Sequence, residues 1–280
     1  MPDPFRYCLN TATIRRHELG IVKEVDLAAK AGYGAIEPWI DAIRAYRQAG
    51  GSLKDLRKRI RDAGLKVPGA IGFAGWLVDG KRARAKQLEL AKADMDLVRQ
   101  IGGTGIAAPP FGMVEKKNLN PLVAAERYRA LLELGDEMGI VPQLEVWGFS
   151  TAICRLSEAT KIAMETGHPK ACLLLDVYHL YKGGSDFHGL KLLHGRAVPM
   201  FHMNDYPADP SRETIVDADR VWPGDGVAPM GQVLRDLKAV GFRGWLSLEL
   251  FNPTYDKRPA GTVARTGLRK MKSAVAKALK

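Results

Sequence analysis

Short apolar runs alternate with longer amphipathic stretches along the whole chain. The short runs hold four to six residues between glycine, proline or polar residues, which is typical of β-strands. The longer stretches repeat apolar residues at the spacing of one helix face. The pattern predicts strands at 6–10, 35–39, 67–71, 105–108, 141–146, 172–177, 198–203 and 245–250. It predicts helices at 18–31, 53–63, 81–101, 121–138, 151–166, 187–194, 230–240 and 261–279.

The strict alternation of eight strands with eight helices favours a closed (β/α)8 TIM barrel, formed as one α/β domain over residues 1–280. Single-domain barrels commonly reach this length. An open doubly wound sheet would instead predict a glycine-rich fingerprint after the first strand. The segment "CLNTAT" at 8–13 contains no glycine, so the closed barrel is the better prediction.

The longest stretch without periodicity is 207–229, "PADPSRETIVDADRVWPGDGVAP", between the seventh strand and its helix. A loop of this length in a compact domain is usually either functional or disordered. Because it contains Ile215, Val216, Val221 and Trp222, we expect it to be ordered and packed at the mouth of the barrel.

Composition narrows the range of partners. Lysine and arginine exceed aspartate and glutamate by 42 to 31, but the basic clusters at 54–66, 81–87 and 265–280 fit the solvated faces of amphipathic helices. No basic run alternates with aromatic residues that could stack on bases, so we expect no nucleic-acid partner. No run of about 18 apolar residues exists, so we expect no membrane span. An N-terminus without an apolar signal core and three scattered cysteines predict a cytoplasmic protein.

Four ionisable residues lie in or just after four consecutive apolar strands. Glu145 lies in "QLEVW", Asp176 in "LLLDVYH", His202 in "MFHMND" and Glu249 in "LSLELF". Any one of them could be a core polar group bonded to the backbone or to an arginine. Burying three carboxylates and an imidazole together without partners would be costly, and a shared divalent cation removes that cost. The carboxyl ends of barrel strands are also where the chemistry of this fold lies.

The sequence therefore predicts a metal site with three carboxylate ligands and one imidazole. This ligand set favours Mn²⁺, with Mg²⁺, Co²⁺ or Zn²⁺ as alternatives that geometry decides.

Four further residues are candidates for substrate binding, each with a structural alternative. His179 would face the barrel mouth, or would be a helix-start histidine bonded to solvent. Glu37 could bind a substrate hydroxyl or pair with an arginine. Trp147 could stack on a sugar face or simply pack at the rim. Arg212 could bind substrate or hold the long loop through an aspartate.

The other arginine of the loop, Arg220, could also bind substrate, but we favour a structural role for it. It would hold the loop through Asp205, Asp217 or Asp219. Asp205 itself, just past the seventh strand, is expected to fix the loop through Arg212 or Arg220.

The segments "LEVW", "LLLDVYHLYKGGSD", "FHMNDYP", "DADRVWPGDG" and "LSLELFNPTY" resemble the sugar phosphate isomerase/epimerase family of xylose isomerase-like TIM barrels. Within it, the inosose isomerases are the group that the chain resembles most. The loop pattern D-R-V-W-P-G-x-G and the following E-L-F-x-P-x-Y are the most specific part. The resemblance implies that Glu145, Asp176, His202 and Glu249 are the metal ligands and that His179 contacts substrate.

These ligands suggest isomerisation or epimerisation of a keto-cyclitol or keto-sugar, by proton transfer through a metal-bound enediolate. Glu145 and Glu249 would remove and return the proton from opposite sides of the mouth. A dehydratase of an inosose or keto-sugar would use the same site. Remoter alternatives are an abasic-DNA endonuclease, which would need histidines after the second and third strands, and a barrel with a structural metal only. A homo-oligomer is possible.

Overall fold

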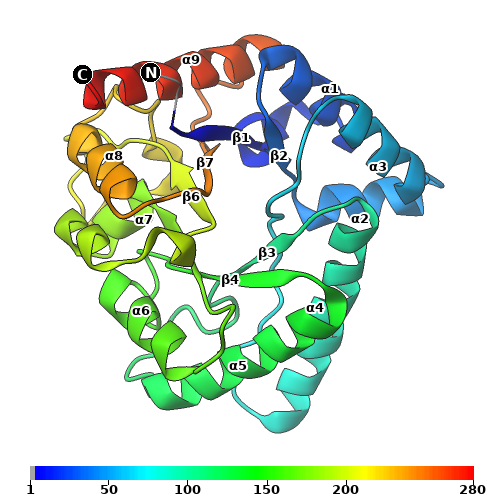
Figure 1. The fold of residues 1–280 in the computed structure, drawn as a ribbon, viewed down its shortest axis with the longest axis vertical. Helices are drawn as coiled ribbons and strands as arrows, with labels where there is room; N and C mark the ends of the chain where they lie inside the picture. The colour runs from blue at the N-terminus through cyan, green and yellow to red at the C-terminus, as the bar shows by residue number, and fades with distance from the viewer. Residues whose placement is uncertain (1–3) are drawn as a thin grey trace.

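Parallel strands curl into a barrel that helices surround (Figure 1), in a computed structural model that describes residues 4–280. Seven strands form one parallel sheet in the order β2-β1-β7-β6-β5-β4-β3. The strands are β1 (Arg6–Asn10), β2 (Ala35–Glu37), β3 (Gly105–Ala108), β4 (Val141–Glu145), β5 (Leu173–Asp176), β6 (Met200–Met203) and β7 (Trp245–Leu248). The TIM barrel predicted from the sequence is confirmed.

The eighth position in the barrel is occupied by the segment 67–71, but only through isolated bridges. Val67 pairs with Gly103 on one side, and Ile71 pairs with Trp39 on the other. The amide of Ala107 also donates to the Ala70 carbonyl at 2.9 Å. A continuous strand was predicted here, and Pro68 explains the difference because proline has no N–H to donate to the ladder.

The helices cover the outer face of the barrel. They are α1 (Ile21–Ala31), α2 (Ile40–Gln48), α3 (Leu53–Asp62), α4 (Lys81–Gln100), α5 (Pro121–Met138), α6 (Leu156–Glu165), α7 (Val177–Lys182), α8 (Met230–Ala239) and α9 (Ala260–Ala278). Two of them, α2 and α7, were not predicted, because each follows a strand without an intervening turn signal. The helix predicted at 187–194 is a 3-10 helix, η2 (Phe187–Leu192).

The α5 helix shows how local sequence fixes an element. The side chain of Asn120 accepts from the amide of Leu122 at 2.9 Å and so caps the first turn, where Pro121 needs no N–H partner. Gly139 ends the helix in the left-handed conformation at φ 70°. Both ends agree with the prediction.

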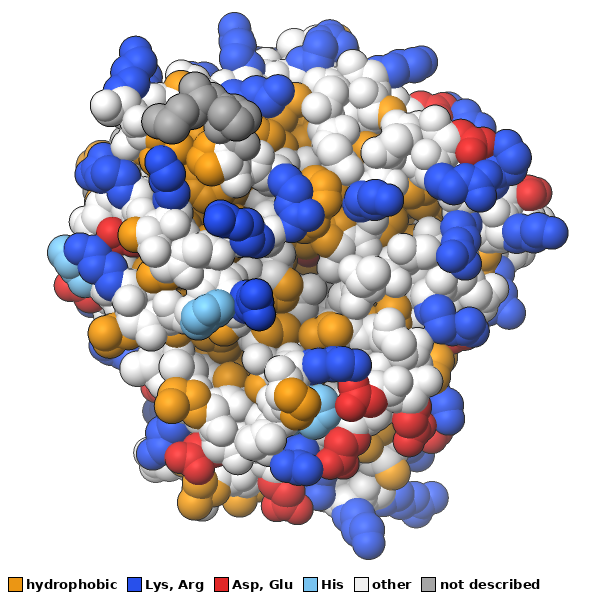
Figure 2. Space-filling view, in the orientation of Figure 1, with side chains coloured by type: hydrophobic (Ala, Val, Ile, Leu, Met, Phe, Trp, Pro, Cys, Tyr) orange, Lys and Arg blue, Asp and Glu red, His pale blue; other side chains and the backbone are white. Residues whose placement is uncertain are grey.

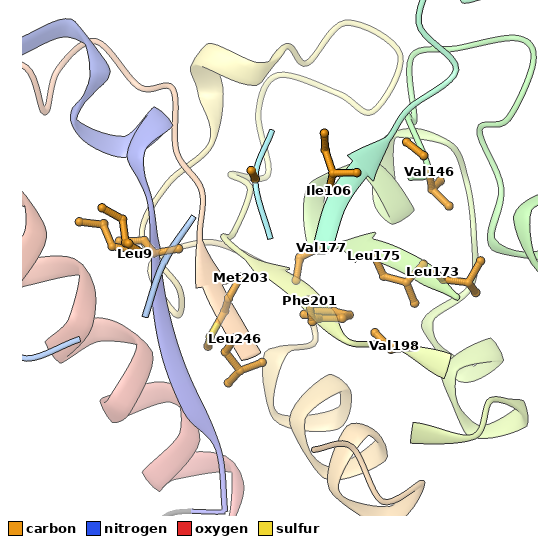
Figure 3. Close-up of a cluster of buried hydrophobic side chains, with 14 of the residues drawn as sticks. Leu9, Ile106, Val146, Leu173, Leu175, Val177, Val198, Phe201, Met203 and Leu246 are labelled. Carbon is orange, nitrogen blue, oxygen red and sulfur yellow. The ribbon is translucent and has the colours of Figure 1, made fainter. Parts of the chain in front are cut away.

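Alternating residues of each strand face either the helices or the barrel interior. Figure 3 shows outward side chains, among them Leu173 and Leu175 of β5 and Phe201 of β6, in one buried apolar cluster. A second, smaller cluster of buried residues fills the barrel interior and consists of Ile71, Ala107, Leu174 and Met200. The same alternation turns Asp176 and His202 inward.

The three cysteines, Cys8, Cys154 and Cys172, are all free, as predicted. Within the described part of the chain, no helix has both the length and the apolar character that crossing a membrane requires.

Candidate metal centre

Three of the four predicted ligands converge at the carboxyl ends of β5, β6 and β7. Asp176, His202 and Glu249 each bring one ligand atom within 4.8 Å of the others, and all three side chains are buried. The Nδ1 atom of His202 lies 3.3 Å from Oε2 of Glu249 and 3.8 Å from Oδ2 of Asp176. The in-register pairing of Asp176 with His202 across β5 and β6 produces this convergence.

His202 Nδ1 is the observation that makes this group fit a cation. It is buried and has no hydrogen-bond partner. An imidazole nitrogen that is buried beside two carboxylate oxygens and forms no hydrogen bond is a suitable ligand for a divalent metal. In residues 4–280 no other group of three or more such side chains comes this close together.

The other ring nitrogen of His202 is held from behind by Glu37. Nε2 lies 3.0 Å from Oε2 of Glu37, which also accepts from Ser247 Oγ at 2.7 Å and from Asn10 Nδ2 at 3.0 Å. Asn10 Nδ2 reaches Glu249 Oε1 at 3.0 Å as well. A carboxylate in this position fixes the orientation of a ligand histidine.

Arg220 lies among the same carboxylates. Its Nη1 donates to Asp176 Oδ2 at 3.1 Å and to Glu249 Oε2 at 2.8 Å, and its Nη2 lies 3.1 Å from His179 Nε2. Nη2 also pairs with Asp217. The guanidinium is almost completely buried, and it faces the ring of Tyr178 at 4.5 Å. It supplies positive charge where two carboxylates would otherwise repel each other.

Burial and mutual charge shift the pKa values of these groups. Burial raises the pKa of Glu145 to about 8, and Glu249 and Asp176 contribute in the same direction. Burial also raises the pKa of Asp176. For Glu249, the charges of His202 and Arg220 outweigh burial and lower the pKa. For His202, burial is outweighed by the charges of Glu249 and Glu37, which raise the pKa.

A cavity of about 340 Å³ opens on this group at the mouth of the barrel. Glu145, Glu249 and Asp217 provide its carboxylates, and His179 also lines it. Most of the remaining wall is aromatic or apolar and comes from several loops. These residues are Trp39, Ile71, Phe73, Trp147, Phe149, Ala218 and Phe251, with Arg16 and Asp217 at the polar side.

The structure brings only some of the predicted substrate-binding residues to this cavity. His179 and Trp147 line it. Glu37 is 1% exposed and lies behind His202, outside the lining. Arg212 is exposed and its guanidinium contacts the neighbouring Glu213, away from the cavity. Glu145, the predicted fourth ligand, lines the cavity without joining the group of three ligand atoms.

Asp205 holds the long loop, but not through an arginine. Its carboxylate accepts from the backbone amides of Tyr206, Gly224 and Ala228 at 2.8–2.9 Å. The predicted arginine partner was therefore wrong. The Asp205 carboxylate faces the backbone at the far end of the loop, so hydrogen bonds from backbone amides take the place of the expected ion pair. The loop is further fixed by a bridge between Asp205 and Val221.

Sequence reasoning missed the position of Arg220 and the supporting roles of Asn10, Asn204 and Ser247. Asn204 Nδ2 donates to Asp176 Oδ2 at 2.7 Å. Two signals were available. Arg220 belongs to the specific D-R-V-W-P-G-x-G pattern, and the others occupy inward positions at or beyond the strand ends, in phase with the ligands.

Known proteins resemble the chain over nearly its whole length. An inosose isomerase from Bacillus velezensis is 26% identical over 277 residues, which is 97% of this chain and 98% of that protein. A 3-dehydroshikimate dehydratase from Pseudomonas aeruginosa is 24% identical over 258 residues, 89% of this chain and 39% of that protein. A crystal structure of the IOLI protein with a bound zinc atom superimposes with a TM-score of 0.90 at 24% identity, covering 99% and 100% of the two chains.

The match to a protein family agrees with the barrel. It extends over residues 25–274, from α1 to α9. The chain therefore belongs to the xylose isomerase-like TIM barrel family.

Proposed function

We propose that the chain is a divalent-metal-dependent isomerase or epimerase of a keto-cyclitol or keto-sugar. The observation that carries the proposal is the buried group of Asp176, His202 and Glu249. In this group His202 Nδ1 has no hydrogen-bond partner, and Glu249 lines a cavity together with Glu145. The names of the relatives, inosose isomerase among them, support the same class of reaction.

Asp176, His202 and Glu249 would hold the cation, with Glu145 as the fourth ligand. When bound, a divalent cation polarises a substrate carbonyl and so acidifies the adjacent C–H bond. Three carboxylates and one imidazole favour Mn²⁺. The zinc atom in the IOLI protein structure makes Zn²⁺ the other metal to test.

The proton transfer itself is assigned to Glu145 and Glu249. Both carboxylates line the cavity, and their strands, β4 and β7, are separated by β5 and β6. They therefore approach a bound substrate from different sides. One removes the proton next to the ketone, giving an enediolate, and the other returns a proton to a neighbouring carbon or to the opposite face. The first outcome is isomerisation and the second is epimerisation.

His179 and the aromatic wall would orient the substrate. The ring of His179 is buried at the cavity, with Nδ1 accepting from the Gly148 amide at 3.3 Å and Nε2 next to Arg220. This arrangement fixes the ring and supports a hydrogen bond between His179 or Arg220 and a substrate oxygen. Trp147, Phe73 and Trp39 give the opposite wall an apolar face suited to the C–H side of a ring.

The test is turnover of inososes and 3-keto-sugars by protein dialysed against chelator and then supplied with Mn²⁺ or Zn²⁺. We expect activity only with metal, and incorporation of solvent deuterium into the product. Complete retention of the substrate hydrogen would instead favour a hydride shift. E145Q and E249Q should each abolish turnover while keeping the fold, whereas E213Q, which changes an exposed carboxylate, should not. Activity of E249Q close to that of the wild type would contradict the assignment.

A dehydratase of an inosose or keto-sugar is the second candidate. It is favoured by the 3-dehydroshikimate dehydratases among the relatives. The same enediolate would then expel a β-hydroxyl group. Mass spectrometry of the product separates the two, since only dehydration removes one molecule of water.

An abasic-DNA endonuclease has less support. It would need several zinc ions bound by histidines from early strands, and the segments 35–39 and 67–71 contain none. A gel-shift experiment with abasic DNA tests it directly, and we expect no specific complex.

A further inference from the structure

A second cavity, of about 440 Å³, lies at the amino-terminal ends of the strands, opposite the candidate metal centre. It is bounded by the first residues of β1, β4 and β7 and by the segments that lead into β3, β5 and β6. The side chains that matter here are Arg6, Gln143, Lys170, Arg196, Arg243 and Trp245, and we call this space the basic cavity.

The interior of the barrel separates the basic cavity from the metal centre. Leu174, Met200 and Trp245 are register partners across β5, β6 and β7, two residues before the level of Asp176 and His202. Leu174 and Met200 belong to the buried apolar cluster of the interior, and Trp245 packs against it from the side of the basic cavity. A ligand in the basic cavity therefore would not touch the residues proposed for catalysis.

The lining of the basic cavity has four cationic side chains and no carboxylate. Lys170 has a partner, Asp136, at 2.6 Å. In the described part of the chain, Arg6, Arg196 and Arg243 form no ion pair with any acidic side chain. Three arginines around one hollow, with no acidic partner among residues 4–280, raise the local positive potential and favour an anion.

The position of Arg6 is fixed although its charge is not neutralised. Its guanidinium lies over the Trp245 ring at 4.5 Å and donates to the carbonyl of Arg243. Figure 2, seen from the amino-terminal ends of the strands, shows Lys and Arg side chains gathered around a central hollow. Together these observations describe a concave site whose three arginines are exposed to solvent at its rim.

We propose that the basic cavity binds the phosphate group of a small organic phosphate. Guanidinium groups match phosphate oxygens with paired hydrogen bonds, and several of them together favour an anion of more than one negative charge. The volume leaves room for an organic part beside the phosphate, against Trp245 and Gln143. This site is independent of the keto-sugar reaction proposed above. It gives a role to arginine side chains that lie away from the metal centre.

Isothermal titration calorimetry on the full chain tests the proposal. The protein is first dialysed against chelator, so that phosphate cannot bind through a metal. The probes are glucose 6-phosphate with glucose as its control, and AMP with adenosine as its control. We expect one phosphate ester to bind with a stoichiometry of one, and its unphosphorylated control not to bind. The tighter binder of the two, the sugar phosphate or the nucleotide, identifies the class of organic phosphate that the cavity prefers.

Two matched double variants decide whether the basic cavity is responsible. R196Q/R243Q removes two exposed cavity arginines, and R57Q/R82Q removes two exposed arginines on outer helices. We expect at least a tenfold loss of affinity in the first and less than a twofold change in the second, because hydrogen bonds to charged groups are lost only in the first. Circular dichroism melting checks that both are folded.

Three results would overturn the proposal: no binding of either phosphate ester, an equal loss in both double variants, or tight binding of duplex DNA that R57Q/R82Q weakens as much as R196Q/R243Q. The last two would indicate diffuse attraction by the whole basic surface.

Discussion

Replacing Arg220 with glutamine should reveal how strongly the two carboxylates of the candidate metal centre depend on one buried cation. The substitution removes the contacts of 3.1 Å to Asp176 and 2.8 Å to Glu249. It leaves both carboxylates buried, with His202 as their remaining cationic neighbour and Asn204 and Asn10 as neutral partners. The metal-free variant should therefore be less stable than the wild type.

The magnitude follows from the burial of these groups. Removing one partner of a buried ion pair typically costs about 3–5 kcal/mol. The entropy of unfolding is about 2.1 cal/mol/K per residue, or about 0.6 kcal/mol/K for a chain of 280 residues. We therefore expect the melting temperature of R220Q to be about 5–8 °C below that of the wild type when metal is absent. A bound divalent cation supplies the missing charge, so saturating Mn²⁺ should reduce this difference by more than half.

The assay is differential scanning calorimetry of chelator-treated protein with and without Mn²⁺. R212Q is the matched control, because it removes an exposed arginine whose ion pair is with its neighbour Glu213. Its melting temperature should stay within about 1 °C of the wild type, as is usual for surface substitutions. The reasoning is refuted if metal-free R220Q has the same melting temperature as the wild type, or if Mn²⁺ leaves the difference between their melting temperatures unchanged.

Two further substitutions test other buried carboxylates. E37Q replaces the charged partner of His202 Nε2, and it should weaken metal binding about 10–100-fold, measured by competition with a chromogenic chelator; an unchanged affinity would show that Glu37 does not orient the ligand. Burial raises the pKa of Glu24 from 4.5 to about 7, so the folded protein holds this proton more tightly than the unfolded chain, and the wild type loses stability as the pH rises from about 4.5 to 7. E24Q removes this loss, so in urea unfolding it should be more stable than the wild type by up to about 3 kcal/mol at pH 8 and equal to it at pH 4.5. A difference that does not vary with pH would contradict this explanation.

Much of the barrel could be predicted because its signals are local. The strands at 6–10 and 105–108 and the helix at 121–138 match the structure at both ends. Each strand is a short apolar run between turn residues, and the helix has Asn120 and Gly139 as its caps. The segment 67–71 was less predictable. Its apolar residues resemble a strand, but Pro68 has no N–H and so cannot donate a hydrogen bond to a neighbouring strand.

The candidate ligands could be predicted for a related reason. Alternation along a strand sends every second residue inward, and a carboxylate or imidazole in such a position must find a partner. Asp176, His202 and Glu249 satisfy both conditions in the sequence itself. Strand alternation cannot separate Arg212 from Arg220, because both lie in one loop, yet one is exposed and the other almost completely buried.

The sequence by itself thus determined the alternating barrel pattern, though not α2 and α7, and the inward polar residues at the carboxyl ends of the strands, because periodicity and strand direction are properties of short segments. Only the tertiary structure decided that Glu37 supports His202, that Arg220 lies between Asp176 and Glu249, and that three arginines from separate parts of the chain line one cavity. These contacts join residues from 29 to more than 160 positions apart, and closure of the barrel creates them.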